Sequence, residues 1–277
     1  MLDREVLRNS AIEVTDNERL TMTATGQFTK IEVGQTDGIA VLTLASDKVN
    51  ALDVETLEQM VAYLDECEGD AAVRALVVTG QGAIFSAGLN VGEVLDNEKG
   101  RTAVLLGSLT TTLVRLFAFP KPTVAAINGP AIAGGCILAC ACDKRLIAEG
   151  ARIGATELKV GVSFPVFAVE LLQHACGADA EQLIFDAALL DGEEACRRGL
   201  AQRVVAAEDL RAEALDLARA LASLDAPAYA LAKATTRRHA LAIGDDEGAR
   251  ALNEQVLAQW QADPTRASLE RLRKPKG

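Results

Sequence analysis

A glycine pair at the start of a predicted helix is the first feature of this sequence with chemical potential. The apolar, β-branched run at residues 122–127 predicts a buried strand, and the apolar run at residues 132–142 predicts a buried helix after a turn. Gly134 and Gly135 lie at the start of that helix, where backbone N–H groups lack intrahelical partners and glycine lets a ligand approach. Such donors suit an oxygen that gains negative charge, although the same glycines also fit a tight turn with no further role.

Two loops carry further candidates. Residues 152–161 are irregular in pattern and contain one acid, Glu157. Taken alone, a glutamate in a loop is most often simply hydrated, so the segment by itself assigns it no role. In the second loop, residues 84–90, the side chains around Gly88 are small, so another molecule could approach the backbone closely. An ordinary loop after a strand is the alternative interpretation.

Composition bounds the class of protein. The chain has 277 residues, of which 49% are hydrophobic and 24% charged, which is the balance of a globular protein with an ample core. Aromatic residues make up only 4%, so aliphatic side chains must fill that core. The formal net charge of −11 disfavours nucleic acid as the main partner, because binding phosphates requires a basic surface.

The six cysteines suggest thiols rather than a metal site or disulfides. Cys136, Cys140 and Cys142 lie within one apolar helix without paired C-x-x-C spacing, and the chain has only two histidines. We therefore expect small buried thiols, no metal and a reducing compartment. No apolar run is suited to span a membrane, and the N-terminal residues resemble neither a secretory signal nor a transit peptide. A cytoplasmic protein with no membrane partner is expected.

Strands and helices are predicted to alternate through most of the chain. Asp37 and Gly38 predict a hairpin between residues 31–33 and 39–44, and Asp53 is placed to cap the helix that follows. The alternation implies an α/β fold with a mostly parallel sheet. Beyond Val205 the pattern is purely helical, typical of an appendage that packs on a neighbouring subunit. The predicted organisation is a loosely ordered extension at residues 1–27, a core at 28–206 and a C-terminal helical subdomain at 207–277.

No common nucleotide or nucleophile motif is present. The sequence contains neither a P-loop nor a dinucleotide-binding G-x-G-x-x-G after its first strand, and it has no G-x-S-x-G elbow. Three other segments, residues 85–90, 122–143 and 154–165, in this order and spacing resemble the crotonase (enoyl-CoA hydratase/isomerase) superfamily. The resemblance implies a spiral of ββα units with a C-terminal helical trimerisation region. It also implies fatty acid metabolism, an acyl-CoA thioester substrate, a homotrimer or hexamer, and no cofactor besides the CoA of the substrate.

The resemblance also implies a catalytic site. Two backbone N–H groups, matching Leu89 and Gly134, would hold the thioester oxygen, and Glu157 would be the base. Removing a proton beside a thioester makes an enolate whose charge falls on that oxygen, so preorganised donors stabilise it. Family hydratases carry a second glutamate directly after G-G-C, where this chain has Ile137, which cannot titrate. A single base suits moving one proton from the α carbon to the γ carbon, which is an isomerisation.

Three further motifs resemble the mitochondrial type of enoyl-CoA isomerase. Other functions also remain open. The motifs around Cys136, around Asp143 and at residues 157–161 carry this similarity. The alternatives are a hydratase or another crotonase reaction with one glutamate, and a catalytically silent acyl-CoA-binding protein. Thr156 and Asn90 depart from the usual proline and aspartate, which bears on specificity more than on the reaction.

The substrate-binding residues expected from the resemblance are six. Lys48 matches a basic CoA-contacting loop only loosely, and Ala51 lies in the same loop. Phe164 and Phe167 would shape an apolar acyl pocket that excludes water and thereby raise the pKa of the catalytic glutamate. The complete expected set is Lys48, Ala51, Ala87, Ile137, Phe164 and Phe167.

Overall fold

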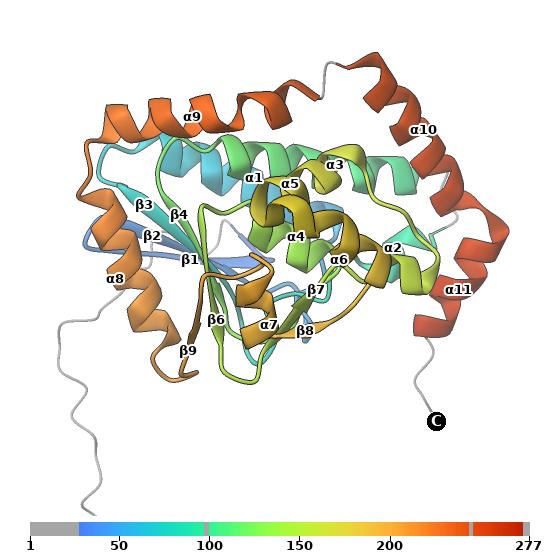
Figure 1. Cartoon of the computed structure of the whole chain (residues 1–277), viewed down its shortest axis with the longest axis horizontal. Helices are drawn as coiled ribbons and strands as arrows, with labels where there is room; N and C mark the ends of the chain where they lie inside the picture. Colours follow the sequence, from blue (N-terminus) through green and yellow to red (C-terminus); the bar gives the residue numbers. More distant parts are fainter. Residues whose placement is uncertain (1–27, 97–99, 244–245, 274–277) are drawn as a thin grey trace, which may run out of the picture.

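The computed structural model describes residues 28–96, 100–243 and 246–273. The predicted loose extension at residues 1–27 lies outside the described residues. Within them the chain forms one α/β core with helices wrapped around a twisted sheet, and its C-terminal helices follow the edge of that core (Figure 1).

A six-stranded sheet forms the centre of the core. Its strands in spatial order are β1 (Ile31–Thr36), β2 (Ile39–Leu44), β3 (Ala75–Gly80), β4 (Thr123–Ile127), β6 (Lys144–Ala148) and β9 (Arg203–Val205). β1 and β2 pair antiparallel and every later pair is parallel, which confirms the mostly parallel sheet predicted from the sequence. The predicted hairpin is also confirmed, because Asp37 and Gly38 adopt φ of 51° and 78°, as a two-residue turn of this type requires.

A second, three-stranded sheet stands beside the first. It consists of β5 (Ala131–Ile132), β7 (Arg152–Gly154) and β8 (Leu190–Asp191), with β5 and β7 parallel. The Asn128 side chain supports the turn from β4 into β5, since its Oδ1 accepts a hydrogen bond from the N–H of Gly80 at 3.0 Å. The second sheet brings the loop after β7 next to the start of the helix that follows β5.

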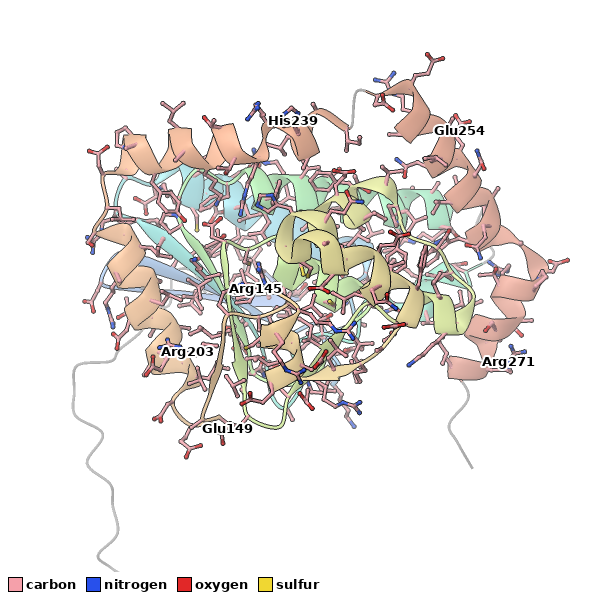
Figure 2. The ribbon with its side chains drawn as sticks, in the orientation of Figure 1. Arg145, Glu149, Arg203, His239, Glu254 and Arg271 are labelled. Atoms are coloured by element: carbon pink, nitrogen blue, oxygen red, sulfur yellow. The ribbon has the colours of Figure 1, made fainter. Side chains whose placement is uncertain are left out.

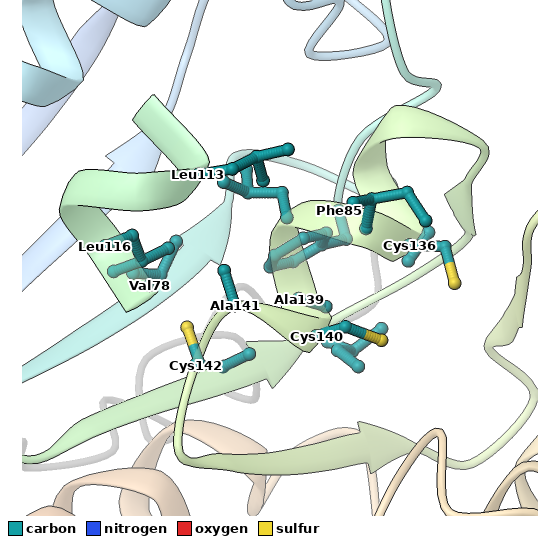
Figure 3. Packing of buried hydrophobic residues seen from close by; sticks show 14 of the residues in the cluster. Val78, Phe85, Leu113, Leu116, Cys136, Ala139, Cys140, Ala141 and Cys142 are labelled. Atoms are coloured by element: carbon teal, nitrogen blue, oxygen red, sulfur yellow. The ribbon is translucent and has the colours of Figure 1, made fainter. Parts of the chain in front are cut away.

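Helices fill the connections between the strands. Asp53 caps the first of them as predicted, its Oδ1 accepting from the N–H of Thr56 at 2.7 Å. Helix α4 (Gly134–Cys140) is buried along its whole length, and Figure 3 shows its cysteines among apolar side chains of the core. The helices before the C-terminal region are α1 (Val54–Gly69), α2 (Val91–Val94), α3 (Arg101–Ala118), α4 (Gly134–Cys140), α5 (Val166–Cys176), α6 (Ala180–Asp186) and α7 (Gly192–Arg197), with 3₁₀ turns η1 (Glu157–Val160) and η2 (Gly177–Asp179).

The C-terminal helices pack on the core of their own chain. α8 (Leu210–Ala222) contacts β3 and β4, and α9 (Ala226–Ala242) contacts α3 and α5. α10 (Glu247–Gln261) also contacts α3 and α5, and α11 (Asp263–Arg273) contacts α2 and η1. The helical pattern is typical of an appendage that packs on a neighbour rather than on its own core, but these helices contact their own core. The trimerisation expected of this region stays a prediction.

A buried charge cluster fastens α9 to the core. Asp143, just before β6, accepts hydrogen bonds from Lys233 and from the hydroxyl of Tyr229, at 3.0 and 2.9 Å. Arg237 lies 2.6 Å from the same carboxylate, and its guanidinium lies 4.0 Å from the centre of the Phe117 ring. Burial lowers the pKa of Lys233 to about 8, opposed by the Asp143 charge. The cluster sets where α9 crosses the core.

Three further expectations concern thiols, metals and membranes. Cys67, Cys136, Cys140 and Cys142 are buried, and all six cysteines are free, which confirms the predicted thiols. Within the described ranges, no group of three or more side chains is arranged to hold a metal ion. No helix in those ranges combines the length and apolar character that crossing a membrane requires.

Candidate active site

A cavity of about 210 Å³ lies where the loop after β3, the start of α4, the η1 turn and the C-terminal helices meet. Most of its lining is apolar. Six of the residues predicted from the sequence share this lining: Ala87, Leu89, Gly134, Ile137, Glu157 and Phe164. Segments far apart in the sequence thus form one site.

The backbone N–H groups of Leu89 and Gly134 border the cavity without a hydrogen-bond acceptor in the described part of the chain. Leu52 forms a bridge with residues 88–90, donating to Gly88 O and accepting from Asn90 N, both at 2.9 Å. Because both bonds of this bridge use the residues on either side of Leu89, the Leu89 N–H points away from Leu52. Among the described residues neither Leu89 N–H nor Gly134 N–H donates a hydrogen bond. A Cβ built on Gly134 would lie 3.5 Å from the Leu89 nitrogen, so the two donors border the same small space.

The glycines are needed where two backbone segments meet. Gly88 has φ of +89°, and a Cβ there would lie 2.9 Å from Ile132 O. A Cβ on Gly135 would lie 2.4 Å from Ser86 O. The sequence suggested that another molecule approaches the small residues around Gly88. The structure shows that the chain's own backbone makes this approach, which brings the two N–H donors together.

Ala133, directly before Gly134, adopts an unusual backbone conformation. Its φ of 52° and ψ of −122° lie in a region that favours glycine, and such a residue typically costs about 1–3 kcal/mol. The conformation is maintained from the second sheet, because the Ala133 N–H donates to Gly154 O at 2.9 Å. This turn sets the direction of the Gly134 N–H.

Glu157 is a buried carboxyl at the start of η1. Its exposed fraction is 7%, and its Oε2 has no hydrogen-bond partner among the described residues. Loss of solvation raises the pKa of Glu157 to about 8, and a hydrogen bond from its own backbone N–H acts in the opposite direction. A carboxyl with this pKa takes up and releases protons near neutral pH, as a general base requires.

Ile137 contributes a hydrocarbon side chain where a second acid would stand in a two-carboxylate site. It is buried in the first turns of α4 and lines the cavity with Glu157. In the described part of the chain, Glu157 is the single titratable residue of the lining. The cavity thus offers one base, two N–H donors and apolar walls.

Three predicted substrate-binding residues lie outside the cavity lining. Lys48 is exposed, and Ala51 is buried with its N–H donating to Asp47 Oδ1 at 3.1 Å, so contact of either with CoA stays a prediction. The Phe167 ring instead packs edge-on against Phe117, with ring centres 5.9 Å apart. Phe167 is a core residue rather than a wall of the cavity, because on helix α5 it is the next residue, Ala168, that faces the cavity.

Sequence reasoning missed the contribution of the C-terminal helices to the site. Trp260 of α10 and Leu269 and Leu272 of α11 line the cavity. No local motif marks these residues, since they reach the cavity only through the packing of α11 on α2 and η1. Asn90, noted as a departure from the usual aspartate, caps α2 by accepting from the N–H groups of Gly92 and Glu93.

Comparison with known proteins decides the family. The family model described as enoyl-CoA hydratase/isomerase matches residues 34–272. The chain belongs to the enoyl-CoA hydratase/isomerase family. A Bacillus subtilis (strain 168) protein named a probable enoyl-CoA hydratase is 38% identical over 188 residues, 67% of this chain and 71% of its own. The short-chain-enoyl-CoA hydratase of Clostridium acetobutylicum is 34% identical over 205 residues, 72% and 78% of the two chains.

The fold agrees with this family. The structure of human mitochondrial delta3-delta2-enoyl-CoA isomerase is similar with a TM-score of 0.84 and 27% sequence identity, covering 90% of this chain and all of that one. The crotonase fold predicted from the sequence is thus confirmed, and the protein is an enzyme of the enoyl-CoA hydratase/isomerase family. Because the relatives carry both hydratase and isomerase names, the choice between the two reactions depends on the residues of the cavity.

Proposed function

We propose that this enzyme is an enoyl-CoA isomerase, which shifts the double bond of a 3-enoyl-CoA to the 2-enoyl position. The observation that carries the proposal is the pairing of Glu157 with Ile137 in one apolar cavity. Hydration requires a water molecule held and activated beside the substrate, and a hydrocarbon side chain supplies no hydrogen bond for that water. One buried carboxyl is sufficient to carry a proton between two carbons.

The reaction follows from the positions of the three groups. Glu157 removes a proton from the α carbon, and the charge of the resulting enolate moves to the thioester oxygen. The N–H groups of Leu89 and Gly134 donate to that oxygen, and one such donor typically lowers a barrier by about 3–4 kcal/mol. Glu157 then returns the proton to the γ carbon. The substrate is neither oxidised nor reduced, so the proposal includes no cofactor besides the CoA of the substrate.

The test is turnover of a 3-enoyl-CoA to the conjugated thioester, followed by absorbance. We expect activity in the wild type and a loss of about 10²–10⁴-fold in Glu157→Gln, which keeps the shape of the side chain but removes the base. Glu149→Gln is the control, because Glu149 is an exposed glutamate on the turn between β6 and β7 (Figure 2). Wild-type hydration of 2-enoyl-CoA that exceeds isomerisation would contradict the proposal.

The hydratase names of the curated relatives favour a second candidate, an enoyl-CoA hydratase with one glutamate. The same assay run with 2-enoyl-CoA decides between the two reactions. A catalytically silent acyl-CoA-binding protein would bind the thioester without turning it over in either direction. The unpaired N–H donors and the raised pKa of Glu157 support catalysis over silent binding.

Assembly and location are proposed from the family resemblance. We infer a homotrimer or hexamer, which light scattering on the purified protein tests directly, a monomer being the contradicting result. Two large apolar side chains, Leu224 between α8 and α9 and Leu231 on α9, are exposed in the single chain and are available to such an interface. A cytoplasmic location stays a prediction.

A further inference from the structure

We propose that Trp260 limits the length of the acyl group that this pocket accepts, an inference that rests on the proposed function. Trp260 comes from α10, outside the segments that carry the N–H donors and the base. With the thioester oxygen at Leu89 and Gly134, and Glu157 beside the first carbons, the rest of the acyl group must run along the apolar lining. Trp260 is the largest side chain of that lining.

The burial of the lining residues indicates where the pocket closes. Leu272 is 55% exposed, which places it at the open rim. Trp260 and Leu269 are only 6% and 3% exposed although they line the same cavity. An acyl group that grows away from the thioester therefore meets the indole as part of a closed wall.

Hydrogen bonds hold this wall in place. The Trp260 indole N–H donates to Ser163 O at 2.8 Å. Its neighbour Gln259 accepts from the Ser163 N–H at 3.1 Å, and Thr265 of α11 donates to Gly161 O at 3.2 Å. The wall is thus bound to residues 161–163, which directly follow the η1 turn that carries Glu157. A longer acyl group cannot displace the indole without breaking these bonds.

The wild-type protein is tested first with ligands that bind but offer no double bond to shift. CoA alone and the saturated butanoyl, hexanoyl, octanoyl, decanoyl and dodecanoyl thioesters are titrated by calorimetry. We expect the affinity to rise about fourfold per added methylene until the acyl tip reaches the indole, and then to level off. Affinity that rises steadily through dodecanoyl-CoA would overturn the proposal.

Fluorescence reports the same contact directly, because Trp260 is the single tryptophan of the chain. We expect CoA alone to leave the emission unchanged, and acyl groups long enough to reach the wall to shift it. A signal that does not depend on acyl length would overturn the proposal. Both wild-type measurements remain decisive if a variant fails to fold.

Variants then separate the bulk of the indole from its hydrogen bond. In Trp260→Leu we expect the affinity plateau to move by two or more carbons, with the longest thioesters binding at least about tenfold tighter than to wild type. Trp260→Phe loses the bond to Ser163 but keeps an aromatic ring, so its profile should stay near that of wild type. Leu252→Ala, exposed on α10 outside the cavity, is the control. An unchanged profile in folded Trp260→Leu, or an equal change in Trp260→Phe, would refute the role of bulk.

The turnover assay keeps this proposal separate from the proposed function. If the affinity plateau moves in Trp260→Leu but the protein turns over no 3-enoyl-CoA, the acyl-length limit set by Trp260 is supported and the isomerase proposal is rejected. If the protein is an active isomerase but its affinity shows no plateau with acyl length, the isomerase proposal is supported and the acyl-length limit set by Trp260 is rejected.

Discussion

The backbones of Gly88 and Gly134 approach so closely that a Cβ on Gly88 would lie 3.0 Å from the Gly134 nitrogen. This contact joins the loop after β3 to the start of α4. Because the Gly134 nitrogen is part of this contact and Leu89 directly follows Gly88, the same contact sets the spacing of the two proposed oxyanion donors. Catalysis should therefore be sensitive to a single methyl group at this point.

Gly88→Ala is expected to lower turnover about 10²–10³-fold, the loss typical of removing one oxyanion donor. It should also lower stability, since alanine rarely adopts φ of +89° and its Cβ would meet Ile132 O. Turnover and thermal unfolding measure the two effects. The matched control is Gly107→Ala in α3, where a Cβ meets nothing within 4 Å and alanine favours the helix. Equal losses in both variants would contradict the role of the contact.

Isomerase activity should rise with pH through the pKa of Glu157, about 8 in the free enzyme. The carboxylate is the active form of the base, and burial disfavours that form, so activity is lost as the pH falls below this value. The acidic limb of the pH profile of kcat/KM measures this pKa. A limb near 4.5, the ordinary value of a glutamate, would show that Glu157 is solvated when it acts.

Glu157 should also lower the stability of the wild type at alkaline pH. The unfolded chain releases this proton near pH 4.5 and the native state retains it until about pH 8, so stability falls as the pH rises between these values. The full shift corresponds to about 3–5 kcal/mol. Glu157→Gln should thus match wild type near pH 4 and exceed it at pH 9 in urea unfolding. Equal stability of the two proteins at pH 9 would contradict the claim that the buried Glu157 carboxylate destabilises the native state.

The charge cluster under α9 gives a prediction about stability alone. Asp143→Asn leaves the buried cations of Lys233 and Arg237 without a counter-charge, which typically costs about 3–5 kcal/mol. The free energy of unfolding measures this loss. Glu213→Gln is the control, because Glu213 forms an exposed ion pair with Arg203 that should contribute less than about 1 kcal/mol. Of this pair, Figure 2 labels Arg203. A similar small effect of both variants would show that α9 is held by apolar packing.

Local chemistry explains which features were predictable. The hairpin at Asp37, the cap at Asp53 and the glycines at the start of α4 depend on the conformations that one or two residues favour, and the structure confirms each. The parallel sheet follows from the alternation of strands and helices. The place of Ile137 after the glycines likewise follows from sequence order, so the single-carboxylate character of the site was visible in the sequence.

Only the tertiary structure decided what surrounds these residues. Residues of α10 and α11 line the cavity together with Glu157, and the helical pattern of these segments is the same whether they pack on a neighbour or on their own core. Phe167 faces the core and Trp260 the cavity, because helix orientation and long-range packing determine which way a side chain points. The sequence by itself determined the fold, the glycine-rich turn that carries the proposed N–H donors, and the presence of one carboxyl with Ile137 in place of a second. The packing of distant helices decided which side chains enclose the cavity that Glu157 lines, because these contacts join residues far apart in the chain.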